Sequence, residues 1–226
     1  LNKKTDAISR KVDLLHKKID YYKDVRIALI KKITNQGLDN NVELVKSPLP
    51  WLDRCPSHWQ FLRGKEIIKE NIKSKISAND GLKKGKYKFF TSSDIQSKWL
   101  DYYTVNEESI LFSTGGMAGV NYCDKEYSYS TDCWSVQIEK YHTKYYYYYY
   151  QSIIYEIGVI GFKGAGLEHL QKDFIKQGLV PVFSKQEQIE ITNFLDDKTM
   201  KIDKIINNIS LQIKHLKELR KTLINE

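Results

Sequence analysis

The sequence predicts an α+β fold, in which one globular segment of mixed strands and short helices lies between two long terminal helices. Apolar residues recur at helical spacing over residues 1–32 and again over residues 195–226. Between them, short runs of aromatic and β-branched residues alternate with Gly, Asn, Asp and Ser, which is typical of strands and turns. The chain has 226 residues, so the part between the helices is long enough to bury one core.

The two terminal segments repeat one another. Aligned end to end, residues 1–32 and 195–226 are identical at nine of 32 positions, and their apolar positions follow the same intervals of 4, 3, 4, 3, 3 and 4 residues. These intervals predict a coiled-coil seam with one slip, and we expect the two helices to pack as an antiparallel hairpin. Ile30, Ile205 and Ile224 should lie outside that seam. The expected seam residues are Ile8, Val12, Leu15, Ile19, Tyr22, Val25, Leu29, Ile202, Ile206, Ile209, Ile213, Leu216, Leu219 and Leu223.

The first helix should end at Gly37, because glycine suits a helix C-terminal cap. Residues 37–59 contain three of the four prolines, which predicts an extended linker. We expect Trp51 and Trp59 to attach this linker to the globular segment. Residues 60–76 fit either a short helix or a strand, and residues 80–86 fit a loop. The expected strands that follow are 87–95, 99–105, 109–116, 120–124 and 127–138.

Residues 141–157 predict a helix that carries six consecutive tyrosines. A run of that length covers all faces of a helix, so we expect some rings in the core and some at the surface. Exposed rings could stack on bases, but the simpler interpretation is that the rings pack over one face of a sheet. The remaining elements should be a Gly-rich loop at 161–166, a short helix at 167–176 and a strand at 178–183.

Ser184 followed by Glu187 predicts a capping box at the start of the last helix. The expected domains are a spacer helix at 1–36, a globular domain at 37–184 and a second spacer helix at 185–226.

The net charge of +8 is unevenly distributed. Residues 63–98 hold ten basic and four acidic residues, for a net charge of +6, whereas residues 99–162 hold three and eight, for a net charge of −5. A basic segment of this kind either faces phosphates or forms an ordinary solvated surface.

Several classes of function lack their residue patterns. The histidines are scattered and no paired Cys/His spacing occurs, so we expect no metal site. No catalytic set emerges, so we expect no enzyme activity and no catalytic residue. No apolar run approaches the roughly 18–20 residues of a membrane span. The three cysteines, Cys55, Cys123 and Cys133, form no C-x-x-C pair and predict buried, reduced thiols in a cytoplasmic protein.

Both junctions resemble one known family. Residues 37–59 (GLDNNVELVKSPLPWLDRCPSHW) and 179–199 (LVPVFSKQEQIEITNFLDDKT) are similar to the segments that flank the conserved helices in specificity subunits of type I restriction-modification systems. Asp53 replaces the family's usual Gly, and Val182-Phe183-Ser184 replaces the family's usual double proline. Within the globular segment, YKFFTSSDI, ILFSTGGMAGVNYC, STDCW and GLEHLQKDF are similar to the family's target recognition domain in order and spacing.

The resemblance implies one target recognition domain with both conserved helices. Such a chain would be half of a full specificity subunit or a naturally half-length one, and the latter should form a homodimer. It would bind double-stranded DNA and read one half of a bipartite target. Modification (methyltransferase) subunits would bring S-adenosylmethionine and a restriction subunit would bring ATP, with no cofactor in this chain. The alternatives are a coiled-coil scaffold protein with a ligand-binding head and no DNA specificity, or a monomeric methyltransferase, whose motifs are absent.

We expect DNA contacts from the basic loop and from the Gly-rich turns. Lysines there should bind phosphates, whereas Ser, Asn and His are better suited to read bases. The expected contact residues are Lys84, Lys86, Ser92, Ser93, Lys98, Thr114, Gly116, Met117, Asn121, Lys163, His169 and Lys172.

Overall fold

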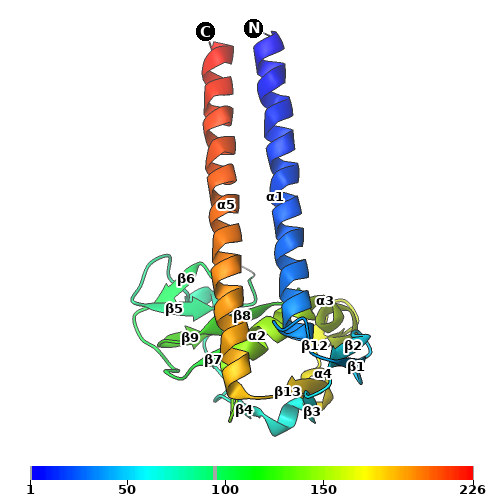
Figure 1. Cartoon of the computed structure of the whole chain (residues 1–226). Coiled ribbons are helices and arrows are strands. Elements are labelled where there is room, and N and C mark those ends of the chain that lie inside the picture. The colour runs from blue at the N-terminus through cyan, green and yellow to red at the C-terminus, as the bar shows by residue number, and fades with distance from the viewer. Residues whose placement is uncertain (1, 94–95, 226) are drawn as a thin grey trace. The chain divides into compact units, whose positions relative to one another are not determined.

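The structure is a computed structural model that describes residues 2–93 and 96–225 (Figure 1). It divides into two compact units, one made of residues 1–30 with 193–226 and the other of residues 31–192. Asp94 and Ile95, the end of the expected strand 87–95, lie outside the described residues. Leu1 and Glu226, in the two terminal segments, also lie outside them.

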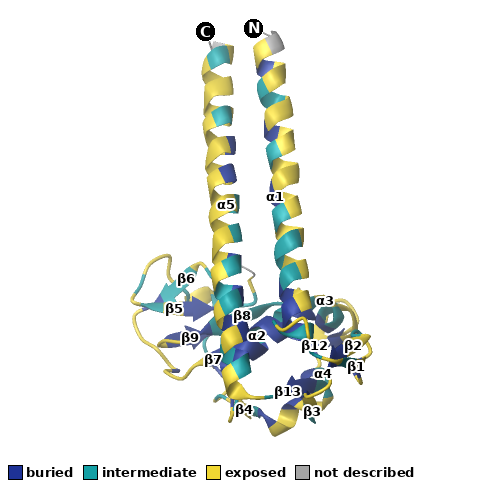
Figure 2. Ribbon diagram, viewed as in Figure 1, coloured by how far each residue is buried: buried dark blue, intermediate teal, exposed yellow. Residues whose placement is uncertain are grey.

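The first unit is the expected helical hairpin. Helices α1 (Asn2–Gln36) and α5 (Lys185–Asn225) run antiparallel within it, so the start of α1 lies beside the end of α5 (Figure 1). Figure 2 shows buried and half-buried positions following one side of each helix. The buried cluster between the helices, with its partly buried neighbours, is Val12, Ile19, Ile209 and Ile213, flanked by Ile8, Leu15, Tyr22, Ile206 and Leu216.

The expected slip in the seam is wrong for α5. Leu219 is 50% exposed, whereas Leu216 and Leu223 are half-buried. A coiled coil that keeps alternating intervals of three and four residues passes from Leu216 to Leu223 through Arg220. Leu219 therefore points away from the other helix. In α1 the residue equivalent to Arg220 is Arg26, whose Nε lies 3.3 Å from Asp203 Oδ1 across the hairpin.

Of the three isoleucines expected outside the seam, Ile30 is buried, with only 2% of its surface exposed. It lies on the same face of α1 as Ile33 and Thr34, three and four residues on, and both of these are buried. Ile205 and Ile224 are exposed, as expected.

The described residues of the second unit, 31–93 and 96–192, form five small sheets, in which most pairs are antiparallel. The four-stranded sheet has the order β4-β10-β7-β8, and the three-stranded sheet has the order β6-β5-β9, in which β5 and β9 run parallel. The pairs β1-β2, β11-β12 and β13-β3 complete the set. The strands are β1 (Leu44–Lys46), β2 (Arg54–Pro56), β3 (Gln60–Arg63), β4 (Ile68–Glu70), β5 (Tyr87–Phe90), β6 (Lys98–Leu100), β7 (Ser109–Ser113), β8 (Val120–Cys123), β9 (Tyr127–Tyr129), β10 (Cys133–Ile138), β11 (Phe162–Lys163), β12 (His169–Leu170) and β13 (Leu179–Val182).

Short helices connect these strands. The shortest are the 3-10 turns η1 and η2, the single turn α3 and the π-helix η3. The connecting helices, in chain order, are η1 (Gly64–Glu66), η2 (Ala78–Asp80), α2 (Thr143–Ser152), α3 (Ile154–Glu156), η3 (Ile157–Gly161) and α4 (Lys172–Gln177).

Two expected strands are interrupted. The single strand expected at 127–138 is β9 and β10 separated by a turn, in which the N–H of Cys133 donates to the carbonyl oxygen of Ser130 at 3.1 Å. The turn lets β9 join one sheet and β10 another. The strand expected at 99–105 ends at Leu100, and only Val105 forms a further bridge, to Tyr127. The short helix expected at 167–176 begins later, at Lys172, because His169 and Leu170 pair with β11.

The tyrosine run lies in the core of this unit. Five of its six rings are buried and Tyr147 is half-buried, so the expectation of surface rings is wrong. Helix α2 packs on strands β7, β8 and β10, so these rings lie between layers. Backbone carbonyl groups accept hydrogen bonds from the hydroxyls of Tyr145, Tyr146 and Tyr149, which makes burial of these polar atoms tolerable. The donors are Tyr145 to Thr34 at 2.9 Å, Tyr146 to Pro181 at 2.9 Å and Tyr149 to Leu179 at 3.1 Å.

The linker and the helix caps form largely as expected. Gly37 has φ of 75° and its N–H donates to the carbonyl oxygen of Ile33 at 3.0 Å. Trp59 is buried and stacks on Phe183 at 4.2 Å between ring centroids. Ser184 Oγ accepts from the N–H of Glu187 at 3.2 Å, which is half of the expected capping box.

The other half of the capping box is replaced. Instead of reaching back to Ser184, the Glu187 carboxylate accepts from Trp59 Nε1 at 3.1 Å and from His58 Nε2 at 2.9 Å. The three cysteines are free and buried.

Candidate nucleic-acid interface

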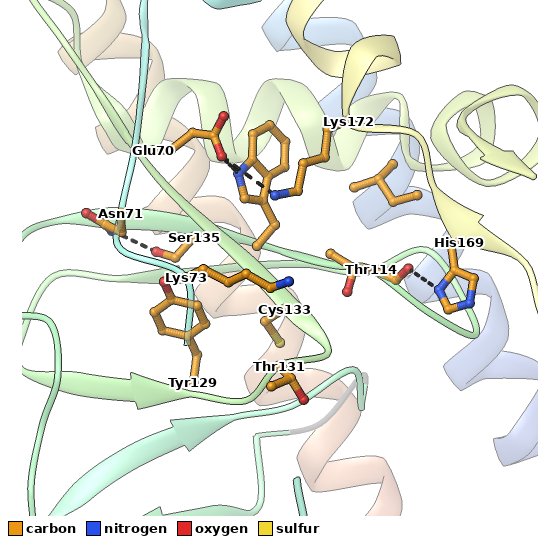
Figure 3. Close-up of a pocket in the computed structure, with 12 residues that line it drawn as sticks. Glu70, Asn71, Lys73, Thr114, Tyr129, Thr131, Cys133, Ser135, His169 and Lys172 are labelled. Carbon is orange, nitrogen blue, oxygen red and sulfur yellow. Dashed lines mark hydrogen bonds and ion pairs between the residues drawn. The ribbon is translucent and has the colours of Figure 1, made fainter. Parts of the chain in front are cut away.

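A pocket of about 230 Å³ lies where β4 and β7 end and β10 begins. The register of the four-stranded sheet brings these ends together, because Ser113 pairs with Cys133 and Glu70 pairs with Val136. Side chains from β12 and α4 complete the walls (Figure 3). The lining is mostly polar and comes from four segments that are far apart in the sequence.

Three of the expected DNA contacts meet in this pocket: Thr114, His169 and Lys172. A bridge between Gly115 and His169 attaches β12 to the end of β7, and the N–H of Leu170 donates to the Thr114 carbonyl oxygen at 3.0 Å. His169 Nδ1 lies 3.2 Å from the same oxygen, which can only accept, so Nδ1 carries the proton. This leaves Nε2 of a neutral His169 as an acceptor at an exposed position.

Asn71 organises the base of the pocket. Its Nδ2 donates to Ser109 Oγ at 3.0 Å and to Ser135 Oγ at 2.8 Å, and its Oδ1 accepts from Gln137 Nε2 at 2.6 Å. The Tyr127 hydroxyl bonds Ser135 Oγ at 2.6 Å, and burial raises the pKa of Tyr127 to about 12. These bonds fix Ser135 in place at the pocket wall.

The Glu70 carboxylate binds positively charged side chains at the rim of the pocket. It accepts from Trp134 Nε1 at 2.8 Å, lies 3.6 Å from Lys172 Nζ and forms a second ion pair with Lys176. Both lysines also lie over the Trp134 ring, at 5.0 and 5.8 Å from its centroid. Partial burial alone would raise the pKa of Glu70, but the bonds from Lys176 and Trp134 and the charges of both lysines outweigh burial and lower it.

Four other expected contacts lie on nearby loops and strands, outside the pocket lining. Gly116 has φ of 76° and forms the exposed turn between β7 and β8 with Met117, which is 72% exposed. Asn121 lies in β8 opposite Leu111. Lys163 is exposed in β11, where it pairs in register with His169. Glycine at position 116 is required by the positive φ, because an L side chain rarely adopts it.

The five contacts expected from the basic loop lie elsewhere, around the three-stranded sheet, and none of them lines the pocket. Lys84 and Lys86 are exposed, and the Lys86 ammonium lies 5.0 Å from the centroid of the Tyr87 ring. Lys98 is half-buried and its Nζ donates to the carbonyl oxygen of Ala78 at 2.6 Å. Ser92 and Ser93 follow β5, half-buried and exposed respectively.

Residue patterns did not single out several residues that line the pocket. Glu70, Asn71, Lys73, Thr131 and Ser135 are among them. The usable signals were the position of Lys73 inside the basic segment 63–98 and that of Thr131 inside STDCW. The others become neighbours through strand pairing between distant segments.

Within residues 2–93 and 96–225, no group of three or more His, Cys, Asp or Glu side chains is placed to hold a metal ion. No helix in the same ranges is long and apolar enough to span a membrane.

Two comparisons with known proteins bear on the family. Residues 56–215 match the family model of the type I restriction modification DNA specificity domain. This match covers more than half of the chain and includes most of the second unit and part of α5. A search of curated proteins found no match.

Solved structures with the same fold include the specificity (S) subunit of a type I restriction-modification system from M. genitalium, with 13% identity, a TM-score of 0.62 and coverage of 97% of this chain and 57% of that one. The HsdS subunit from Thermoanaerobacter tengcongensis has 13% identity, a TM-score of 0.56 and coverage of 98% and 54%.

A chain from a structural study of complex assembly and conformational transition in the type I restriction-modification system has 13% identity, a TM-score of 0.67 and coverage of 99% and 56%. This chain thus spans a little over half the length of these relatives. The match over residues 56–215 places it in a family: the chain belongs to the type I restriction modification DNA specificity domains.

Proposed function

We propose that this chain recognises DNA sequence for a type I restriction-modification complex, with its one globular unit reading one half of a bipartite target. The observation that carries this proposal is the family match over residues 56–215. The same match disfavours a scaffold protein without DNA specificity.

The pocket and the neighbouring loops are the proposed DNA-facing surface. The exposed Lys163 is suited to a phosphate, and His169 and Asn121 carry groups that can pair with base edges. The exposed Lys84, Lys86 and Ser93 belong to the basic segment or lie beside it, and would add further contacts. In this proposal the chain performs no chemistry and acts in the cytoplasm. Modification subunits bind S-adenosylmethionine and a restriction subunit binds ATP.

A homodimer is the proposed assembly if the chain acts at this length. Several large apolar side chains on the hairpin are exposed, among them Leu14 at 65%, Leu211 at 54% and Ile224 at 52%. A second hairpin would cover them, and a two-fold axis would then present two identical globular units. The target would be an interrupted palindrome. If the chain is half of a longer subunit, a second and different recognition domain makes the target asymmetric.

The decisive experiment is affinity purification of the tagged chain from its native host. We expect methyltransferase subunits to co-purify and the resulting complex to methylate one DNA sequence. A chain that purifies without them, and that confers no sequence-specific methylation when they are supplied, would contradict the proposal.

A further inference from the structure

The pocket at the end of β7 is large enough for a small polar group. Its volume of about 230 Å³ is several times the ~30 Å³ that one water molecule occupies in the liquid. The backbone around it is fixed, because Thr114 accepts from Leu170 on one side and Thr131 donates its N–H to the Ile76 carbonyl oxygen at 2.9 Å on the other. A ligand group entering the pocket therefore meets a preformed wall.

Two lysines and two threonines line this space. Lys73 extends across the pocket from one side and Lys172 enters from the other (Figure 3). Thr114 and Thr131 add side-chain hydroxyls. Among the described residues no carboxylate forms an ion pair with Lys73, which is exposed. Ammonium and hydroxyl donors at several sides of one small space suit an anion with several oxygens.

The negative charge at the rim of the pocket belongs to Glu70, which already forms ion pairs with two lysines. Glu70 pairs with both Lys172, which lines the pocket, and Lys176, which lies outside the lining. The Glu70 and Lys172 side chains are 39% and 40% exposed, so their 3.6 Å ion pair is open to water. An ion pair of this exposure is weak and easily exchanged. Lys176 and Trp134 would still hold Glu70 after Lys172 left it.

We propose that this pocket seats one phosphate group of the DNA backbone, held by Lys73, Lys172 and the hydroxyls of Thr114 and Thr131, and that Glu70 occupies Lys172 until DNA binds. The inference rests on the proposed DNA-recognition function and adds to it a defined phosphate position. Glu70 lowers affinity for DNA of any sequence, because a backbone phosphate must displace its carboxylate from Lys172.

The first test measures binding of the full chain, alone and with its co-purified modification subunits, to a random-sequence duplex over a range of salt concentrations. Lys73→Ala should weaken binding about fivefold near 0.15 M salt, the effect of one lost phosphate contact. The slope of log affinity against log salt should fall by about one. Lys75→Ala is the matched control, because Lys75 is exposed two residues on and does not line the pocket. Equal effects of the two variants would overturn the proposal.

The second test looks for a gain of affinity, which an unfolded variant cannot produce. Glu70→Gln keeps an oxygen for Trp134 but releases Lys172, so the random duplex should bind up to about fivefold more tightly. Glu139→Gln removes one negative charge from an exposed position in the same unit and controls for net charge. A gain from Glu70→Gln no larger than that from Glu139→Gln would overturn the role of Glu70.

A titration with inorganic phosphate, followed by amide chemical shifts, separates the two proposals. If Lys73→Ala leaves duplex binding unchanged, the proposed phosphate site is wrong, and the proposed DNA recognition is unaffected. Phosphate binding that Lys73→Ala abolishes, without duplex binding by the chain or its complex, would assign the pocket to a free phosphate compound. That result would overturn both the DNA seat and the proposed function.

Discussion

Asn71 is the residue on which the pocket wall most depends. Its amide links Ser109, Ser135 and Gln137, which come from β7 and β10. Because Asn71 follows β4 directly, one side chain joins three neighbouring strands of the same sheet. Removing it leaves Gln137 without its partner in a half-buried position.

We therefore expect Asn71→Ala to lower the free energy of unfolding by about 1–3 kcal/mol, the cost of unpaired buried polar groups. Urea denaturation followed by circular dichroism measures this as a lower midpoint. Asn79→Ala is the matched control, since Asn79 is exposed in η2, and it should change stability by less than about 0.5 kcal/mol. Equal midpoints for the two variants would show that the Asn71 bonds contribute nothing.

Residue patterns in the sequence pointed to some of the residues that line the pocket and missed others, for a physical reason. Thr114 and His169 lie in or beside Gly-rich turns, which are visible as local sequence. Asn71 and Ser135 are 64 residues apart and become partners only through the pairing of β4 with β10. Strand partners depend on non-local packing, so a single sequence without the fold does not reveal them.

At the scale of elements, the hairpin is the part that periodicity predicted best. Ile19 and Ile213 belong to its buried cluster, whereas Leu219 points outward. The slip was inferred from Leu219 because it is apolar, but Leu219 is exposed, and alternating intervals of four and three residues lead from Leu216 to Leu223 through Arg220. A long basic side chain can cover a seam with its methylene groups and keep its charge in water.

Substituting both Ile19 and Ile213 with Asp should unfold the hairpin, since each change loses about 1.5–3 kcal/mol of apolar burial and adds a charge to the seam. Far-UV circular dichroism should report a loss of helix and a lower melting temperature. Leu219→Asp should leave both nearly unchanged. If Leu219→Asp were as damaging as the double variant, the assignment of the seam would be wrong.

Helix α2 makes the globular unit sensitive to alkali. Burial raises the pKa of Tyr145, Tyr146, Tyr149 and Tyr150, in Tyr145 and Tyr149 by a large amount. Unfolded tyrosine ionises near pH 10. The stabilisation from these neutral phenols is therefore complete below about pH 10 and is lost as the pH rises above it, because the unfolded chain then binds fewer protons.

We expect the urea midpoint to fall steadily between about pH 10 and pH 12, with tyrosinate absorbance rising together with the loss of helix. Tyr146→Phe should reduce the slope of the midpoint against pH, since it removes one of these phenols. A midpoint that is constant across this range would contradict the buried, neutral state of the run.

At the scale of the whole molecule, the proposed homodimer is the testable feature. Sedimentation of the full chain at micromolar concentration should give twice the monomer mass. Leu211→Glu should yield monomers, because it places a charge at an apolar position that is exposed in a single hairpin and that the dimer would cover. Leu82→Glu, at a 44% exposed position in the globular unit, should leave the dimer intact. A monomeric wild-type chain would remove the homodimer model.

The target should mirror that assembly. A homodimer predicts methylation at an interrupted palindrome, with a gap set by the hairpin. Residues 2–30 of α1 span about 43 Å at 1.5 Å per residue, or about 13 base pairs at 3.4 Å each. Methylation mapping of the host genome measures the gap directly, and a continuous target would contradict the model.

The buried tyrosine run has a consequence for how this chain can change. Six identical residues in a row are easily lengthened or shortened by one, and the altered sequence would look almost the same. The helix would not tolerate it, since each residue turns an α-helix by about 100°. A seventh tyrosine would leave the six ring positions filled, but it would turn the residues after the run by about 100° and move the buried Ser152 and Ile153 out of their places in the core. The length of this run is therefore as strictly determined as its composition.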